Sequence, residues 1–222
     1  MSSKPKLHYF NGRGKMESIR WLLAAAGIEF EEEFPETRAQ YEKLMADGAL
    51  MYQQVPMVEI DGMKLIQTKA ILHYIAAKNN LYGKNIQERA QIDMYVEGAE
   101  DLMELIMRLI FLPPAEQEKS LTLIKKRAQD RYLPVYEKAV NQNPSGFLIG
   151  DKLSVADVQL LELIFMIEEK FPSILSEFPK LQAFKSKISS IPTIKKFLEP
   201  GSARKPPPDQ EYMRIVKEVL RF

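Results

Sequence analysis

The chain has 222 residues, of which 45% are hydrophobic and 27% are charged, and its formal net charge at pH 7 is +1. These values are typical of a globular protein, and the near-neutral charge excludes the basic surface of a nucleic-acid-binding protein. Cysteine is absent, so disulfides, cysteine zinc sites and a protein-supplied thiol are excluded. No apolar run approaches the ~20 residues of an integral membrane segment. The N-terminus lacks the apolar segment of a secretory signal, so we expect a cytoplasmic protein.

The first third of the chain alternates strand and helix patterns. Alternation from Lys4 to Phe10 predicts a strand. Apolar residues at helical spacing from Met16 predict a helix that ends at Gly27, a residue suited to the C-terminal cap. A short strand over 30–34 and a weak helix over 38–47 follow.

A hairpin comes next. Two apolar runs, Met57 to Ile60 and Met63 to Ile66, flank Asp61-Gly62, a dipeptide that favours a tight type I′ turn. A helix from Thr68 to about Asn79 follows directly. The order β-α-β-α-β-β-α predicts a mixed four-stranded sheet with helices packed on it.

The residues around this hairpin suit a peptide ligand. Val55 precedes Pro56, which forces it to be extended, so its backbone N–H and C=O could pair with an extended peptide. The helix start at Gln67-Thr68 offers backbone N–H groups that suit a carboxylate. The stretch therefore predicts a receptor for a small peptide with a free carboxylate.

Beyond a linker-like break at 79–85, the patterns are helical only. They predict a long helix over 86–111 and a second, after Pro113-Pro114, to about Val140. Ser154-Val155-Ala156-Asp157 begins a helix that is apolar on nearly every side, which we expect at the centre of this region. Shorter helices follow near 180–189 and 193–198. We therefore predict an α/β domain over 1–81 and an all-α domain over 86–222.

The last predicted helix spans about 209–220. Asp209 can cap it, and one face carries apolar residues at helical spacing, beginning at Tyr212. A helix this short is marginal alone in water, so we expect it to fold only against an apolar surface, either permanent or provided by a ligand.

Three segments resemble a known family. They are Pro5 to Gly14, Gln53 to Gly62, and Phe197 to Ser202. In these segments, and along its whole length, the chain is similar to the class alpha glutathione transferases, whose first domain is thioredoxin-like. The resemblance implies a homodimer, or a heterodimer with a close relative, that uses glutathione as co-substrate without a metal. It also implies a cis Val55-Pro56 peptide bond and a catalytic tyrosine, Tyr9, at the end of the first strand.

The thiol must be ionised to react. A thiol with a pKa of ~8.5 is only a few per cent thiolate at neutral pH. Tyr9 can donate a hydrogen bond to the sulfur, and Lys15 adds a positive charge. The family usually has an arginine at position 15, and lysine lacks its planar fork. Alternatives remain: a tyrosine in a strand is often core, Lys15 could be solvated, and Arg13 or Arg20 could take its place.

The remaining glutathione contacts are implied by the resemblance. It assigns Val55 and Pro56 to the cysteinyl unit, Gln54 to the glycyl end, and Gln67 and Thr68 to the γ-glutamyl carboxylate. Asp101 and Arg131 would reach that group across a dimer, although they also read simply as charged helix surface. Where the family often has a second basic residue this chain has Met45, and Lys43 could replace that residue.

The second substrate is expected to be a small hydrophobic electrophile. Family members active on lipid-peroxidation alkenals often combine Gly12, Pro208 and Tyr212, and this chain has all three. Tyr212 could polarise the aldehyde as a general acid, or only pack within the lid helix. The positions that line the family's hydrophobic pocket are Phe10, Gly12, Met107, Arg108, Phe111, Pro208, Tyr212, Val216, Leu220 and Phe222.

Two other functions compete with conjugation. The same pocket could serve an intracellular carrier of hydrophobic ligands, or the chain could be a structural homodimer that retains only the fold. The resemblance makes Tyr52 an aromatic key of the dimer interface, although an intrachain contact is the simpler reading. The two histidines, His8 and His73, lack metal-ligand spacing, so no metal site is expected.

Overall fold

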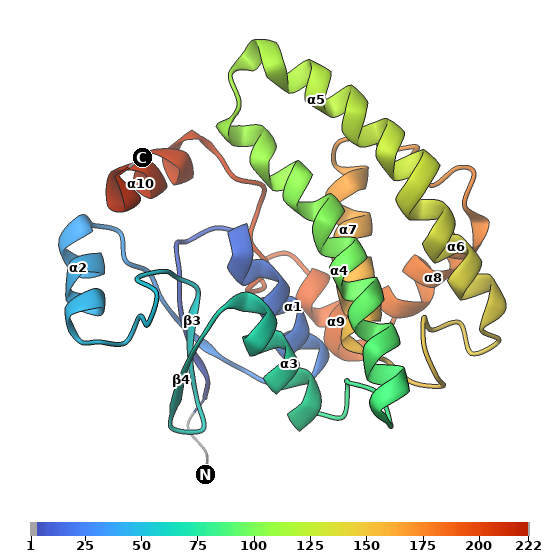
Figure 1. The fold of residues 1–222 in the computed structure, drawn as a ribbon, viewed down its shortest axis with the longest axis horizontal. Helices are drawn as coiled ribbons and strands as arrows, with labels where there is room; N and C mark the ends of the chain where they lie inside the picture. Colours follow the sequence, from blue (N-terminus) through green and yellow to red (C-terminus); the bar gives the residue numbers. More distant parts are fainter. Residues whose placement is uncertain (1–3, 222) are drawn as a thin grey trace. The chain divides into compact units, whose positions relative to one another are not determined.

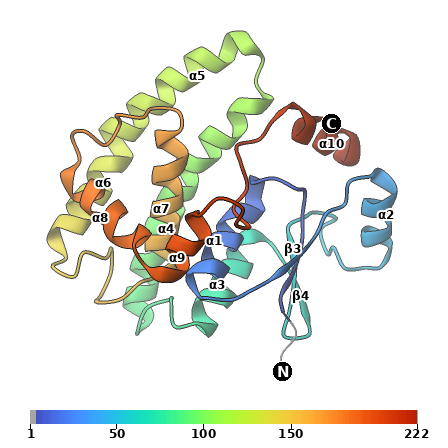
Figure 2. The same cartoon turned by 180° about the vertical axis from the view of Figure 1, so that it is seen from behind.

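The structure, a computed structural model, describes residues 4–221. These residues form two compact units, the first made of 4–75 with 196–221 and the second of 76–195. Figures 1 and 2 show the ribbon from opposite sides. Helices α3 (Thr68–Lys78) and α9 (Pro192–Leu198) each run across a boundary between the units. The division into domains 1–81 and 86–222 stays a prediction.

The first unit is built on a four-stranded sheet in the order β2-β1-β3-β4. Strand β1 pairs in parallel with β2 and antiparallel with β3, and β3 pairs antiparallel with β4. The predicted mixed sheet is therefore confirmed. The strands are β1 (Lys6–His8), β2 (Glu31–Glu33), β3 (Met57–Ile60) and β4 (Met63–Ile66).

The turn between β3 and β4 has the predicted form. Asp61 and Gly62 both have positive φ angles, 52° and 76°. A type I′ turn requires positive φ at both central residues, and its twist matches that of the flanking strands. The register therefore pairs Ile60 with Met63 and Met57 with Ile66.

Helices α1 (Glu17–Ala25) and α2 (Arg38–Ala46) accompany this sheet. Helix α1 follows a short 3-10 turn, η1 (Gly14–Met16), and α2 is capped by the side chain of Thr37. Helix α1 ends before Gly27, whose φ of 70° is the left-handed conformation that terminates a helix. Because α1 is buried on most sides, it anchors the chain that leaves β1.

Helix α10 (Gln210–Leu220) completes the first unit. Figures 1 and 2 both show it beside α2. The side chain of Arg38 on α2 donates a hydrogen bond of 2.9 Å to the carbonyl oxygen of Val219. Met213, Val216 and Val219 are buried along one face of α10, so the predicted amphipathic helix has an apolar surface to fold against.

The described residues of the second unit contain helices and no strand. Helix α7 (Val155–Glu168) is buried along almost its whole length, as its apolar sequence predicts. Gly83 and the linker-like residues around it precede the long helix α4 (Ile86–Arg108). The helices are α4 (Ile86–Arg108), η2 (Leu109–Phe111), α5 (Pro114–Arg127), η3 (Ala128–Tyr132), α6 (Leu133–Gln142), α7 (Val155–Glu168) and α8 (Pro179–Ser189).

The predicted second long helix to about Val140 is present over 114–142, with one local departure from regular α-helix. A π-helical turn, Ala128–Tyr132, separates α5 from α6, although Figure 1 shows the three as one continuous rod. Pro134 lies in the first turn of α6. Proline lacks an N–H and its ring clashes with the carbonyl four residues earlier, so a regular α-helix cannot pass through this point undisturbed. The wider turn lies where that clash would occur.

Candidate functional site

Tyr9 lies directly after β1, and its side chain is buried, with 9% of the residue exposed. Its hydroxyl oxygen accepts a hydrogen bond of 3.1 Å from the backbone N–H of Lys15. Its ring meets that of Phe10 edge to face, with centroids 5.4 Å apart. Because the oxygen already accepts from Lys15, its own hydrogen is available for donation to a ligand.

Two glycines make the loop after β1 close around this phenol. A side chain on Gly14 would overlap the hydroxyl of Tyr9, and Gly14 also has a positive φ of 42°. A side chain on Gly12 would overlap the ring of Tyr212. The loop therefore needs glycine at both positions. Gly12 is required because of the close approach of Tyr212, and Gly14 because of close approach and backbone conformation.

Tyr212 reaches this loop from the first turn of α10. The side chain of Asp209 accepts a 2.8 Å hydrogen bond from the Tyr212 backbone N–H, so the N-terminal cap also fixes the backbone position of Tyr212. Its hydroxyl interacts with that of Tyr9 closely enough for each phenol to influence the pKa of the other. The structure thus brings Tyr9, Gly12 and Tyr212 together within the first unit.

Both phenols are protonated at neutral pH. Burial raises the pKa of Tyr9 and outweighs the opposing effect of the Lys15 N–H. Burial also raises the pKa of Tyr212, and the neighbouring Tyr9 raises it further. Removing a phenol from water disfavours the charged phenolate. Each hydroxyl is therefore a hydrogen-bond donor across the physiological pH range.

The backbone of Lys15 links the phenol to helix α3. Its N–H donates to Tyr9, and its carbonyl oxygen accepts a 3.4 Å hydrogen bond from the hydroxyl of Thr68. Gln67, just before α3, has a φ of 69°. These bonds place the beginning of α3 beside the loop that carries Lys15, as a shared site for Tyr9, Lys15 and Thr68 requires.

The segment before β3 also has the expected form. The Val55-Pro56 peptide bond is cis, which confirms the implication of the resemblance. Pro56 is buried, Val55 is half-buried and Gln54 is exposed. Tyr41 donates a 2.8 Å hydrogen bond to the carbonyl oxygen of Gln53, which ties this segment to α2.

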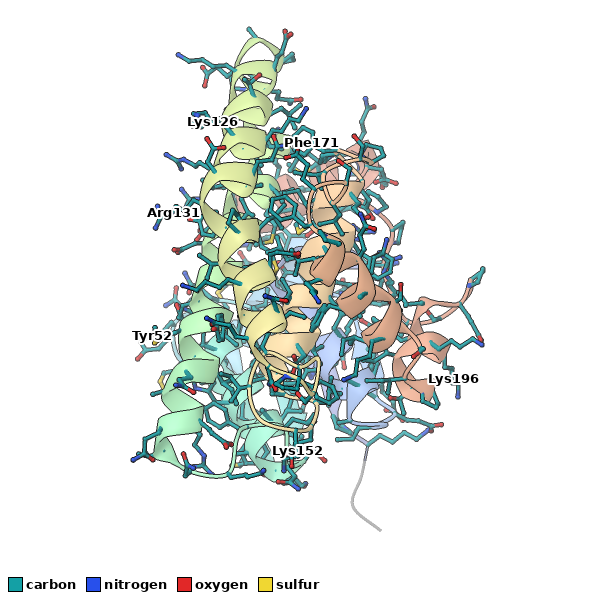
Figure 3. The ribbon with its side chains drawn as sticks, turned by 90° about the vertical axis from the view of Figure 1, so that its right-hand side faces the viewer. Tyr52, Lys126, Arg131, Lys152, Phe171 and Lys196 are labelled. Carbon is teal, nitrogen blue, oxygen red and sulfur yellow. The ribbon has the colours of Figure 1, made fainter. Side chains whose placement is uncertain are left out.

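Other predicted residues lie in the second unit and are described within it. Asp101, Met107 and Arg108 lie on α4, and Arg108 forms an exposed ion pair with Glu104. Phe111 ends η2 and is 47% exposed. Arg131 is exposed in the π-helical turn, and Figure 3 shows it with Lys126 on the outer side of the α5–α6 rod.

The remaining predicted residues belong to the first unit or lie at its end. Tyr52 is 61% exposed, and its neighbour Met51 is 75% exposed. Pro208 is exposed before α10, Val216 is buried on it, and Leu220 is half-buried. Phe222 lies outside the described residues.

A buried cluster of charges was missed by the sequence reasoning. The guanidinium of Arg20 is fully buried and donates to Glu32 at 2.7 Å, to Glu17 at 3.0 Å and to the carbonyl oxygen of Gly12 at 2.7 Å. Burial raises the pKa of Glu17, an effect that Arg20 opposes. The spacing of Glu17 and Arg20 on one helix was a readable signal, but nothing in the sequence marks Glu32 as their partner. Arg20 therefore supports the loop, and it is not an exposed substitute for Lys15.

Residues 4–221 contain no group of three or more histidine, aspartate and glutamate side chains that could hold a metal ion. Within the same residues, no helix is both long and apolar enough to cross a bilayer.

Comparisons with known proteins identify the family. Residues 5–77 match the family model of the glutathione S-transferase N-terminal domain, and residues 100–201 match that of the C-terminal domain. The chain is 62% identical to glutathione S-transferase A4 of Mus musculus over 222 residues and 58% identical to that of Homo sapiens over 221, with 100% of each chain covered. The solved glutathione S-transferase of Ascaris lumbricoides is 28% identical, with a TM-score of 0.78 over 93% of this chain and 99% of that one.

The chain therefore belongs to the glutathione S-transferase family and is a transferase that uses glutathione as co-substrate. Its similarity to relatives named A4 and alpha-4 over their whole length places it in class alpha, as the resemblance implied. The fold class predicted from the sequence, a thioredoxin-like α/β domain followed by an all-α domain, is confirmed.

Proposed function

We propose that this glutathione transferase conjugates glutathione to hydrophobic electrophiles and that Tyr9 stabilises the reacting thiolate. The observation that carries the proposal is the hydrogen bond from the Lys15 N–H to the Tyr9 hydroxyl, at 3.1 Å. That bond orients the phenol and leaves its hydrogen for the sulfur. A raised pKa keeps the phenol protonated, so it acts as a donor and not as a base.

The magnitudes are adequate for this role. Lowering a thiol pKa by about two units requires ~2.7 kcal/mol of preferential stabilisation of the thiolate. A hydrogen bond to a charged acceptor supplies roughly 1.5–3 kcal/mol. The ammonium of Lys15 would add an attraction to the thiolate, with less geometric constraint than an arginine fork would give. Tyr9 is therefore assigned the main role and Lys15 the supporting one.

The rest of glutathione would lie along two segments of the first unit. The backbone of Val55, beside the cis Pro56, is assigned to the cysteinyl unit, and Gln54 to the glycyl end. Gln67 and Thr68, at the start of α3, are assigned to the γ-glutamyl carboxylate, which suits the backbone N–H groups of a helix N-terminus. Asp101 and Arg131 are assigned to the same group across a dimer.

Alkenals from lipid peroxidation are the proposed electrophiles. Gly12 leaves room for the ring of Tyr212, and Tyr212 is influenced electrostatically by Tyr9. Because burial keeps Tyr212 protonated, it can donate to the carbonyl oxygen of an enal while the thiolate adds to the β-carbon. The other residues assigned to the electrophile are Phe10, Met107, Arg108, Phe111, Pro208, Val216, Leu220 and Phe222.

The experiment compares Tyr9→Phe and Tyr212→Phe on two electrophiles, a chloronitrobenzene and a long-chain alkenal. Tyr9→Phe should lower kcat/KM on both by about 10- to 100-fold, since ~1.5–3 kcal/mol of thiolate stabilisation is lost. Tyr212→Phe should lower alkenal conjugation alone. Tyr82→Phe is the matched control, because that hydroxyl binds Asp93 within the second unit. Full activity of Tyr9→Phe with unchanged binding of apolar ligands would instead support a carrier.

We also propose a cytoplasmic homodimer, with heterodimers of close relatives as a variant. Met51 and Tyr52 expose two large apolar side chains side by side, which is unfavourable unless a partner covers them. An aromatic anchor of this kind is a typical energetic centre of an interface. Tyr52→Ala should shift the protein towards monomers in sedimentation velocity. Unchanged sedimentation at micromolar concentration would contradict the role of Tyr52.

A further inference from the structure

Lys205 is held from three directions by the first unit. Its backbone carbonyl oxygen accepts a 2.7 Å hydrogen bond from the side chain of Arg13. Its backbone N–H donates at 3.2 Å to Glu17. Its ammonium pairs with Glu32 at 2.7 Å, and the lysine side chain is only 15% exposed. The chain is thus fixed at this residue to the loop after β1, to α1 and to β2.

The next residues transmit that position to α10. Pro206, Pro207 and Pro208 lead directly to Asp209, the N-terminal cap of the helix. Consecutive prolines have restricted φ angles and form stiff, extended segments of about 3 Å per residue. A shift at Lys205 is therefore passed on to the cap and is not absorbed on the way.

The loop at Gly12, against which Tyr212 packs, is linked through Arg20 to the same carboxylate, that of Glu32. One oxygen of Glu32 binds Lys205 and the other binds Arg20, at 2.7 Å each. Arg20 in turn donates to the carbonyl oxygen of Gly12. The ring of Tyr212 lies where a side chain of residue 12 would be. Glu32 therefore fixes two places. One is Lys205, the start of the segment 205–209 that leads to Tyr212, which we call the arm; the other is Gly12, against which the Tyr212 ring packs.

We propose that Lys205 is a positioning residue that places Tyr212 over Gly12 and thereby sets the preference among electrophiles. The inference rests on the proposed role of Tyr212 in alkenal conjugation. It assigns Lys205 no contact with either substrate. A 1 Å displacement of a reacting group is enough to cost up to about 100-fold in rate, so the tolerance for error in the arm is small.

The test uses Lys205→Met, which keeps the length of the side chain and removes its charge. Lys205→Arg is the conservative rescue, and Lys196→Met, at an exposed lysine of α9, is the matched control. We expect Lys205→Met to lower kcat/KM for the alkenal about tenfold more than for the chloronitrobenzene, and Lys205→Arg to restore most of that difference. Amide hydrogen exchange should become faster within 210–220 in Lys205→Met and stay unchanged in Lys196→Met.

Three outcomes would overturn the proposal. Equal losses on both electrophiles would reduce Lys205 to a stabilising ion pair. Faster exchange without a change of preference would show that the arm moves the helix but not the reactive phenol. Unchanged hydrogen exchange in α10 would show that Lys205 does not control the position of the helix. Failure of the alkenal proposal itself is seen separately, as full alkenal activity of Tyr212→Phe, and the exchange rates of Lys205→Met then decide the role of the arm alone.

Discussion

Helix α7 in the second unit and helix α10 in the first both begin beside an aspartate that accepts backbone hydrogen bonds. At α7, Asp157 is fully buried and accepts from the N–H of Leu148 and from the N–H and hydroxyl of Ser154, at 2.7–2.8 Å. At α10, Asp209 is exposed and accepts from the N–H of Tyr212 alone. Asp157 is the third residue of α7 and completes a capping box with the N-cap residue Ser154, whereas Asp209 is itself the N-cap residue of α10. A carboxylate at a helix start is thus buried and multiply bonded in one unit and exposed in the other.

The difference separates two uses of a helix cap. The carboxylate at α7 satisfies donors that water cannot reach, so losing it leaves buried polar groups unpaired. The carboxylate at α10 satisfies a donor that water can replace, so its loss costs little global stability. What the cap of α10 contributes is position, because the residue that it fixes is Tyr212. The comparison predicts stability effects at α7 and activity effects at α10.

The largest effect is expected from Asp157→Ala. It leaves the N–H groups of Leu148 and Ser154 without an acceptor in the interior, and each costs about 1–3 kcal/mol. We expect the free energy of unfolding to fall by about 3–5 kcal/mol in urea titrations. A loss below about 1 kcal/mol, as for an exposed cap, would show that the burial of this cap has no energetic weight.

The next effect concerns activity at α10. Gly12→Ala places a methyl group where the ring of Tyr212 lies, so the ring or the helix must move. We expect about a tenfold loss of kcat/KM for the alkenal, with unfolding changed by less than about 1 kcal/mol. In a Tyr212→Ala background the same methyl group should have no further effect on the alkenal rate. An additive loss there would contradict the steric explanation.

The buried cap should also make stability depend on pH. Burial raises the pKa of Asp157 from 3.8 to about 6. Because the folded pKa lies above the unfolded one, the group's contribution is complete below pH ~3.8 and is lost as the pH rises through about 6. Relative to Asp157→Asn, the wild-type protein should gain about 1 kcal/mol between pH 7 and pH 5. Parallel pH profiles of the two proteins would contradict the raised pKa.

The smallest effect is expected from Asp209→Ala. Removing an exposed cap costs about 0.5–1 kcal/mol, and the loss should be confined to α10. Hydrogen exchange within 210–220 should become faster, while the urea midpoint of the whole protein changes little. Asp209→Asn keeps an acceptor and serves as the control. A large shift of the urea midpoint in Asp209→Ala would place α10 in the same cooperative unit as the core.

The local elements could be predicted from the sequence because their causes are local. Asp61-Gly62 sets the hairpin turn, Gly27 ends α1, and the capping box of Ser154 and Asp157 begins α7. The contact of Gly12 with Tyr212 could not be found in this way, because the two residues are joined only by the folded chain. The resemblance nevertheless named both of them as site residues.

The buried charges were harder to predict. Glu32 lies between Glu31 and Glu33 in β2, on the strand face that it shares with Phe30 and Phe34, but nothing local indicates its cationic partners. Its burial and its two cationic partners follow only from the way β2, α1 and the C-terminal segment meet. An acidic strand reads as a solvated edge until the elements that cover it are known.

The π-helical turn between α5 and α6 keeps a row of buried residues on one side of the helix. Ile124, Ala128, Tyr132, Tyr136 and Val140 are all buried, and they recur at a constant step of four residues. In a regular α-helix each such step rotates a side chain by about 40° relative to the last, so the row would wind away from the interior. One wider turn takes up part of that rotation. The row consequently stays a single inward-facing stripe along both helices.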